Sequence, residues 1–462
     1  MNEPAIQHYH ELVSRLDTAS LSEISTRFVN ELREHKACYG ERPLSTFLRP
    51  KFVTLQQLDL IKDSCRVLRE AVVKIKEAIF AQPAFMAQLG LSEGERLLCD
   101  IDPGFSRLSI TSRWDSFMTE SAEGPVLKFV ELNADTPAGI AYNDVMSDIY
   151  LHLPFMQEFR QRYNVQPFAV RTILLRQLLD TYKEWQGHKS GRKMPQIGII
   201  DWRGVSTWTE FELMQEYFES QGIHTVLADP RELDYSHDNT GRGILRAGDF
   251  EIDLIYKRVV TNEFIEKLDD VQAMYKAVKN RDVCLINPFR AKLVHKKSLF
   301  AMLTHENNQH LFNAEQQATI RRHIPWTRRL ELTKTIYRDQ TIDLCEYVAH
   351  HKDDFVIKPN DEYGGKGVCL GWETAGGKWV SLINDALDDF YVVQEKVPIA
   401  RESFPYFDPA LRTLRFADLV VDFGPYVFGP MVGGVSTRLS TSSLANVTAG
   451  GGATSTFLIE RK

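Results

Sequence analysis

The spacing of hydrophobic residues predicts that the first hundred residues are mainly helical. In the segment 55–80, LQQLDLIKDSCRVLREAVVKIKEAIF, apolar residues recur every three or four positions, which is the period of one face of a helix. Residues 1–98 as a whole are typical of helices. We therefore expect a helical N-terminal region over 1–100.

The pattern changes after residue 100. The segments SRLSITSRWD (106–115) and PVLKFVELN (125–133) predict two short strands, and a long helical stretch is expected from about Asn143 to Trp185. The polar, basic and glycine-containing segment 187–195 predicts a linker. These segments make a second expected unit over 101–190.

A regular alternation of strands and helices follows the linker. A helix is expected at 208–222, where it ends on a glycine, and another between the last two strands; the strands are expected at 196–201, 224–229, 250–259 and 283–289. This alternation predicts a parallel sheet covered on both faces, in a Rossmann-like domain over 191–290. The first turn, DWRGVS, lacks GxGxxG, so a dinucleotide site has little support.

Polar residues interrupt the apolar strand at 125–133 on one of its faces. Glu131 and Asn133 lie two positions apart, so a strand places both side chains on the same face, and Asp135-Thr136-Pro137 predicts a sharp turn after them. A carboxylate and an amide beside apolar neighbours need polar partners. A hydrated edge strand is the alternative interpretation.

A lysine and a glycine-rich turn near the C-terminus predict a phosphate site. The apolar strand at 355–357 leads to Lys358, and GGKG (364–367) precedes a return strand at 368–370. Glycines let backbone N–H groups approach phosphates closely, and a lysine on a rigid strand supplies a fixed positive charge. An ordinary glycine hairpin is the alternative, and the segment is not a Walker A loop.

Two C-terminal segments add to this pattern. DFYVVQEKVPI (389–399) predicts an apolar strand that ends at QEKV (394–397), where the backbone can face an adenine edge. The segment 436–452 mixes β-branched residues with glycines and predicts a hairpin whose loop is tight or faces a ligand.

Composition and charge narrow the class of protein. The chain has 462 residues, of which 43% are hydrophobic and 25% charged, as in an ordinary soluble enzyme. A net charge of -7 gives no electrostatic reason to expect nucleic acid or an anionic membrane surface as a partner. The six cysteines have no paired spacing, which disfavours a zinc site or a disulfide framework and fits the reducing cytoplasm. No run of about 18 apolar residues predicts a membrane span.

Together these segments resemble the ATP-grasp enzymes, in which a strand lysine, a glycine loop and an adenine hinge form the nucleotide site. The Glu-x-Asn strand precedes the lysine strand by more than two hundred residues, so the order resembles a circular permutation. SRWDSF (112–117), KFVELNADTPAG (128–139) and HKKSLFAML (295–303) are similar to the synthetase domain of glutathionylspermidine synthase. The resemblance implies an α/β (α+β) fold, with a Rossmann-like pre-ATP-grasp domain and with the lid and nucleotide-binding strands over 291–462.

The resemblance also implies ATP and Mg²⁺ as cofactors and a role for individual residues. Arg113 would stabilise the charge on the transferred phosphoryl group or the acyl phosphate. The metal ligands would be Asp115, Glu131 and Asn133. The nucleotide would contact Lys296, Lys358, Gly364, Gly365, Lys366, Gly367, Gln394, Glu395, Lys396, Val397 and Arg438.

A further arginine is predicted to bind the substrate acid. Arg258 lies near the carboxyl end of the strand expected at 250–259, where α/β sheets place ligands, and its guanidinium group suits a carboxylate. The alternative is a surface arginine that pairs with Glu263 or Asp253.

The implied reaction joins a small-molecule carboxylic acid to an amine, such as an amino acid, peptide or polyamine, through an acyl phosphate made from ATP. Two alternatives stay open: an ATP-grasp kinase that phosphorylates without ligation, and a nucleotide-binding protein without turnover. The complete set of Arg113, Asp115, Glu131, Asn133 and Lys358 disfavours the last.

Overall fold

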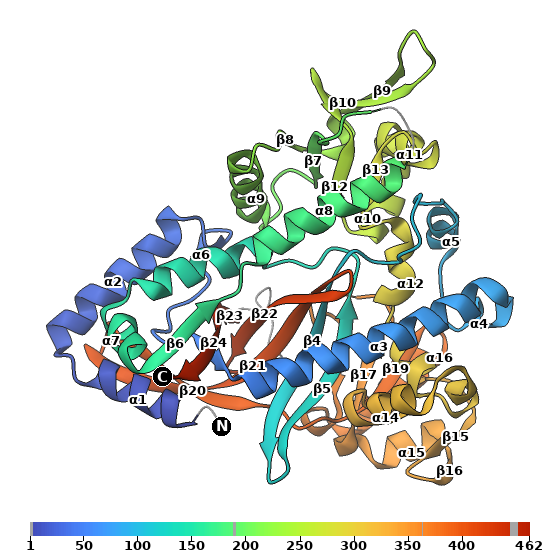
Figure 1. Ribbon diagram of the computed structural model, residues 1–462. Helices are drawn as coiled ribbons and strands as arrows, with labels where there is room; N and C mark the ends of the chain where they lie inside the picture. The colour runs from blue at the N-terminus through green and yellow to red at the C-terminus, as the bar shows by residue number, and fades with distance from the viewer. Residues whose placement is uncertain (1–2, 188–190, 363, 444–450) are drawn as a thin grey trace.

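An antiparallel sheet from two distant parts of the chain forms the centre of the computed structural model, which describes residues 3–187, 191–362, 364–443 and 451–462. Its strand order is β23-β22-β21-β4-β5, and β20 also pairs with β21 (Figure 1). The bounds are β4 (Thr111–Ser121), β5 (Gly124–Asn133), β20 (Arg401–Asp408), β21 (Thr413–Phe428), β22 (Met431–Ser440) and β23 (Gly452–Thr454). The sheet therefore joins the expected units 101–190 and 291–462.

The N-terminal region is mainly helical, as predicted. Its helices are α1 (Glu3–Ser14), α2 (Thr18–Glu34), α3 (Leu55–Ala81), α4 (Pro83–Ala87) and α5 (Glu93–Cys99), with short strands β1 (Cys38–Tyr39), β2 (Arg42–Pro43) and β3 (Lys51–Val53) between α2 and α3. The predicted helix 55–80 is confirmed as α3. It begins at a capping box of Thr54 and Gln57, and its apolar face packs on the central sheet through Ile61, Leu68 and Ile75.

Two expectations for residues 106–185 are wrong in their bounds. The strand expected at 106–115 begins at Thr111, the first residue that pairs with β21, and continues to Ser121. The helical stretch from Asn143 to Trp185 is three helices with a strand between the last two, namely α6 (Ile140–Leu151), α7 (Pro154–Arg162), β6 (Tyr163–Pro167) and α8 (Val170–Gln186).

The physical reasons for these breaks are local and long-range. Pro154 begins α7, because proline can start a helix but cannot continue one. β6 forms because it pairs with β24 (Thr456–Arg461), nearly three hundred residues later, and β24 also pairs with β3. Of the expected linker 187–195, residues 188–190 lie outside the described part of the chain. The same holds for residues 444–450 of the predicted hairpin, whose flanking strands β22 and β23 pair as expected.

The predicted parallel sheet is confirmed, with the order β13-β12-β7-β8. Its strands are β7 (Ile197–Ile200), β8 (Thr225–Ala228), β12 (Leu254–Lys257) and β13 (Cys284–Ile286), and its helices include α9 (Trp208–Ser220), α10 (Thr261–Glu266) and α11 (Gln272–Lys279). Ile197 and Ile199 pack in one core with Phe211 of α9, whereas Ile200 packs in another with Met274 of α11. Both faces of the sheet are therefore covered.

The strand expected at 250–259 is two strands in different sheets. β11 (Phe250–Ile252) pairs with β10 (Gly243–Ala247), which also pairs with β9 (Leu233–His237), and β12 belongs to the parallel sheet. Asp253 separates them. Its buried carboxylate accepts hydrogen bonds from the backbone N–H of Gln196 and from Arg192. The chain therefore passes from one sheet to the other at a buried acid whose hydrogen bonds are made.

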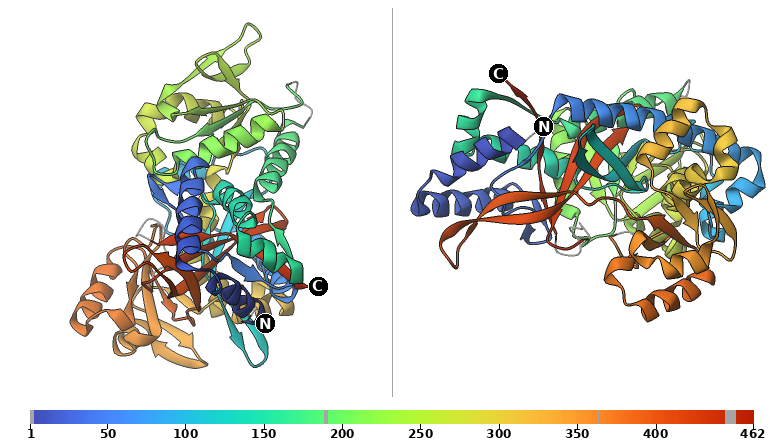
Figure 2. Two further views of the ribbon diagram at one scale, coloured as in Figure 1. Left: turned by 90° about the vertical axis from the view of Figure 1, so that its left-hand side faces the viewer. Right: turned by 90° about the horizontal axis from the view of Figure 1, so that it is seen from below.

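A small antiparallel sheet, β14-β19-β17-β18, forms a third part of the molecule. The predicted strands are confirmed as β17 (Phe355–Pro359), β18 (Cys369–Leu370) and β19 (Tyr391–Glu395), joined by β14 (Thr327–Arg329). Figure 1 and the left view of Figure 2 show this orange part at the bottom of the molecule and the parallel sheet at the top. The remaining elements are α12 (Lys292–His295), α13 (Ser298–Thr304), α14 (Ala314–His323), β15 (Lys334–Tyr337), β16 (Gln340–Asp343), α15 (Leu344–His350) and α16 (Gly376–Leu387).

The carboxyl edge of the parallel sheet holds the turn that follows β5. The Nζ of Lys257 lies 2.5 Å from a carboxylate oxygen of Asp135, and both side chains are buried. Arg258 donates to the backbone oxygens of Thr136 and Pro137. Asn287 donates to those of residues 134 and 135. These contacts fix the parallel sheet against the central sheet.

No helix within the described ranges has the length and apolar character needed to cross a membrane.

We expect Asp135→Asn to destabilise the fold strongly. Lys257 is fully buried, so the variant leaves an unpaired ammonium group, and the free energy of unfolding should fall by about 3–5 kcal/mol. Denaturant unfolding, followed by tryptophan fluorescence, measures this loss.

The matched control is Glu232→Gln, which breaks the Arg203–Glu232 ion pair at 2.6 Å on the surface. We expect this change to cost less than about 1 kcal/mol, because exposed pairs are well solvated when broken. Equal losses in the two variants would contradict a special role for the buried pair.

Candidate functional site

A cavity of about 610 Å³ lies where the main parts of the fold meet. The central sheet contributes residues of β4, β5, β21 and β22, and the small sheet contributes residues of β17 and β19. The carboxyl edge of the parallel sheet and the N-terminal region supply the other walls. Most of the residues singled out from the sequence line this cavity.

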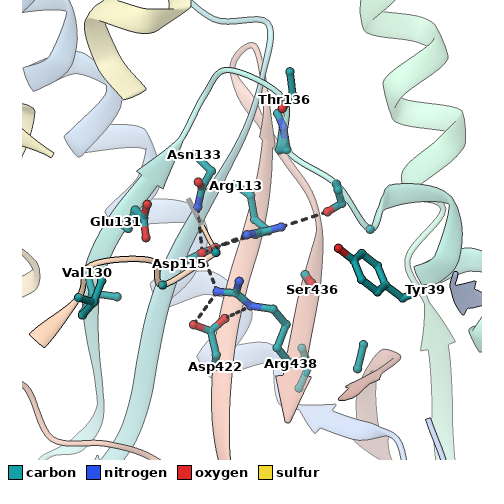
Figure 3. A pocket seen from close by; sticks show the side chains of 18 of the residues that line it. Tyr39, Arg113, Asp115, Val130, Glu131, Asn133, Thr136, Asp422, Ser436 and Arg438 are labelled. Atoms are coloured by element: carbon teal, nitrogen blue, oxygen red, sulfur yellow. Dashed lines mark hydrogen bonds and ion pairs between the residues drawn. The ribbon is translucent and has the colours of Figure 1, made fainter. Parts of the chain in front are cut away.

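Two arginines and two aspartates form an ion-pair cluster on the central sheet (Figure 3). Arg113 binds both oxygens of Asp115, with Nε at 2.6 Å from Oδ1 and Nη2 at 3.1 Å from Oδ2. The Nη2 of Arg438 lies 2.6 Å from Oδ2 of Asp115 and 2.9 Å from Oδ2 of Asp422. The positions of both guanidinium groups are therefore fixed by carboxylates.

The two aspartates of this cluster differ in acidity. Burial opposes the ionisation of Asp115, but Arg113 and Arg438 outweigh it and lower the pKa of Asp115 to about 2. Burial and the charge of Asp115 raise the pKa of Asp422 to about 7, although Arg438 acts in the opposite direction. Asp115 is thus ionised at neutral pH, whereas Asp422 titrates there.

Glu131 and Asn133 line the cavity from the strand next to Asp115. The Nδ2 of Asn133 donates to Asp115, and Glu131 lies 3.1 Å from the Nζ of Lys297. Burial opposes the charged form of Glu131, but Lys297 and Lys358 keep the pKa of Glu131 below its ordinary value.

The residues fit a magnesium ion that is held mainly by phosphates and water. Glu131 and Asn133 offer oxygens on one strand face, and Mg²⁺ commonly takes one or two protein carboxylates beside phosphate oxygens. Both oxygens of Asp115 already accept from arginine or asparagine, so its role as a third ligand stays a prediction. Within the described ranges, no group of three His, Cys, Asp or Glu residues could hold a metal.

Lys358 and Lys296 lie in different environments. Lys358 lines the cavity, and its Nζ donates to Oε1 of Gln394 at 2.7 Å and to the backbone oxygen of Val130. Burial lowers the pKa of Lys358 to about 8, with Glu131 partly offsetting this shift. Lys296 is instead paired with Glu95 and Asp361, each at 2.6 Å, outside the cavity lining.

The glycine loop only partly faces the cavity. Gly364 and Gly365 line it with φ values of 71° and 74°, a left-handed backbone that favours glycine. Gly367 packs tightly against Pro359, because a Cβ added to Gly367 would lie only 2.6 Å from Cγ of that proline. The exposed Lys366 pairs with Glu362 at 3.1 Å.

Part of the predicted adenine hinge is already hydrogen-bonded. The backbone N–H of Glu395 donates to Trp326, and that of Lys396 donates to Asp354. Gln394, Glu395 and Val397 line the cavity, whereas Lys396 does not and its Nζ lies 4.2 Å from the Trp372 ring centroid. The hinge stays a prediction, with Val397 the candidate for its backbone contact.

Arg258 is buried and lines the cavity, so the alternative of a surface arginine is wrong. Asp253 pairs with Arg192, and Glu263 accepts from Trp202. The guanidinium group of Arg258 already donates to the turn after β5, and its Nε has no hydrogen-bond partner in the described structure. The carboxylate clamp stays a prediction.

Sequence reasoning did not single out several residues of the cavity wall, namely Tyr39, Asn143, Asp201 and Asp422. Asp422 interrupts an apolar strand, which is the same signal that identified Glu131. Burial raises the pKa of Asp201, at the carboxyl end of β7, to about 6. Tyr39 and Asn143 come from the N-terminal region and α6, and their sequence context gives no signal of a site.

No family model matches the chain, and no curated protein matches it.

Solved structures do match. A glutathione synthetase-like effector from Globodera pallida matches over 96% of this chain and 98% of its own, with 13% identity and a TM-score of 0.60. A structure assigned to gamma-glutamylcysteine synthetase from Methylobacillus flagellatus KT covers 85% of each chain with 11% identity and a TM-score of 0.39, too low to support a shared fold. The chain thus has the fold of the glutathione synthetase-like effector.

Proposed function

We propose that the protein is an ATP- and Mg²⁺-dependent ligase that forms an amide bond between a carboxylic acid and an amine. One observation carries the proposal: Lys358, Glu131, Asn133, Arg113 and Arg438 come from distant parts of the chain and line a single cavity. The fold shared with a glutathione synthetase-like effector supports it. We also infer a circularly permuted ATP-grasp order, since β4 and β5 precede β17 and β19 in the chain.

The small sheet would hold the nucleotide. Val356, Leu370 and Val397 give its side of the cavity apolar surface that suits an adenine ring. Lys358 would contact the phosphates as a fixed charge, because Gln394 holds its Nζ. The backbone N–H groups of Gly364 and Gly365 would lie over the phosphate chain.

A magnesium ion held by Glu131 and Asn133 would neutralise phosphate charge when bound. Lys297, 3.1 Å from Glu131, is better placed than Lys296 to support this site. Lys296 is engaged by Glu95 and Asp361.

The proposed reaction balances in two steps. An oxygen of the substrate carboxylate attacks the γ-phosphorus of ATP, the bond to ADP breaks, and an acyl phosphate forms. The amine nitrogen then attacks the acyl carbon, inorganic phosphate leaves with the C–O bond electrons, and the amine proton passes to phosphate or solvent. Arg113 and Arg438 would stabilise the negative charge in both steps, and Asp115 already holds them in position.

The direct test is MgATP turnover with pooled acids and amines. A ligase releases ADP and phosphate only when both substrates are present, and mass spectrometry detects the amide. ADP formation with a phosphorylated product and no amine requirement would favour a kinase. Tight nucleotide binding without turnover in any pool would favour a non-catalytic protein.

We expect Glu131→Gln to abolish Mg²⁺-dependent turnover while the fold stays intact. The amide keeps the shape of the side chain but removes its charge, so transition-state charge is no longer balanced and the rate should fall at least about a hundredfold. Coupled ADP detection measures the rate, and Glu123→Gln, on an exposed turn of the same hairpin, is the control. A near wild-type rate in Glu131→Gln would rule out the metal assignment.

We expect Lys358→Ala to weaken nucleotide binding by about 1.5–3 kcal/mol, the scale of a hydrogen bond to a charged group. Calorimetry with a non-hydrolysable ATP analogue measures the change, and the exposed Lys378→Ala is the control.

The wild type should also bind the analogue more weakly as pH rises above about 8. The charged form of Lys358 binds phosphate, and its lowered pKa of about 8 means that this form is lost there. In the calorimetry of the variant, an unchanged affinity of Lys358→Ala for the ATP analogue would contradict the nucleotide site.

A further inference from the structure

One cavity-lining side chain has unmet hydrogen-bonding capacity. Asn143 of α6 is only 3% exposed, and neither its Nδ2 nor its Oδ1 has a hydrogen-bond partner in the described residues. Its backbone is satisfied, with the N–H bonded to Gly139 and the carbonyl oxygen accepting from Ser147 and Ser455. The side-chain amide alone is unpaired, and it belongs to a residue of the cavity wall.

A buried amide without partners is unfavourable, because it has lost its hydrogen bonds to water and gained none in the protein. Native proteins therefore keep such groups rarely, and one in a residue that lines a cavity indicates a ligand or a bound water. Since both atoms of Asn143 are unmatched, the missing partner must accept one hydrogen bond and donate another.

The wall residues that follow Asn143 along α6 or lie beside its backbone partner Ser455 are uncharged. Met146 lies one turn along α6 and also lines the cavity. Ala453 and Thr454 line it from the C-terminal strand, and Ala453 donates its backbone N–H to Leu44, another wall residue. None of these four side chains carries a charge, so nothing among them balances a carboxylate or an ammonium group.

This uncharged end adjoins the arginine cluster. Ala453 is the cross-strand partner of Arg438 in the β22–β23 pair, and adjacent strands lie about 4.8 Å apart. A substrate whose carboxylate lies at Arg113 and Arg438 would therefore extend its other end toward Asn143.

We propose that Asn143 selects the substrate acid by pairing with a neutral amide group on it. An amide offers a carbonyl oxygen for Nδ2 and an N–H for Oδ1, whereas a carboxylate has no donor and an ammonium group no acceptor. The proposal rests on the ligase function and adds to it: the acid carries an uncharged amide where an amino acid carries its ammonium group.

The test compares three matched acids at saturating MgATP with the amine pool. N-acetylglycine carries the amide, glycine the ammonium group, and pentanoate neither, while all three keep the reacting carboxylate. Corresponding sets of the N-acetyl form, the free amino acid and an apolar acid are prepared for the other small amino acids. For the wild type we expect kcat/KM for the N-acetyl form to exceed both counterparts at least about tenfold, the scale of one or two hydrogen bonds.

Variants assign the preference to Asn143. Asn143→Leu keeps the volume without polar atoms and should remove the preference for the amide over the apolar acid. Asn143→Asp keeps the shape with a charge and should move the preference toward the free amino acid. The control is Asn164→Asp on exposed β6, where the wild-type order should persist. If the wild type shows no preference, or if Asn143→Leu keeps the preference, the proposal is overturned, and water alone forms hydrogen bonds with the Asn143 amide.

Failure of the ligase function has a different signature. If no acid supports ADP formation, direct calorimetry of the same acids judges the inference by itself. Wild type should then bind N-acetylglycine more tightly than Asn143→Leu does, and equal affinities overturn the proposal. Calorimetry with the non-hydrolysable ATP analogue judges the nucleotide site separately.

Discussion

The buried ion pair between Lys257 and Asp135 is the constraint on which the rest of the site depends. It joins the carboxyl edge of the parallel sheet to the end of β5, and Arg258 adds hydrogen bonds to the next two carbonyl groups. A buried pair is a weak source of stability, because burial of both charges offsets their attraction. Its value here is positional: the docking that pairs Lys257 with Asp135 also places the turn after β5 in the cavity wall.

Inside the cavity, charge is organised before any ligand arrives. Asp115 orients Arg113 and Arg438 through contacts of 2.6 Å with each guanidinium group, while Gln394 orients Lys358. Side chains held in this way need little reorganisation when negative charge develops beside them, which is the main electrostatic contribution to phosphoryl and acyl transfer. The carboxylates that hold the arginines also keep the cavity from being strongly cationic.

Local patterns predicted what local forces decide. The period of α3, the alternation around β7 and the paired polar positions of β5 were all sufficient to place those elements, because each pattern reflects burial of one face. The β6 strand and the division at Asp253 were not predictable, since one depends on pairing with β24 and the other on Arg192. Likewise, the pairing of Lys296 with Glu95 depends on a contact two hundred residues away.

The two perturbed groups of the cavity make its charge depend on pH in one direction. Asp422, with a pKa of about 7, gains a negative charge as pH rises through neutrality. Lys358, with a pKa of about 8, then loses its positive charge. Both changes make the cavity less attractive to phosphate and carboxylate groups. Because Asp422 also shares Arg438 with Asp115, its ionisation draws Arg438 away from a substrate anion as well as adding a charge that repels it.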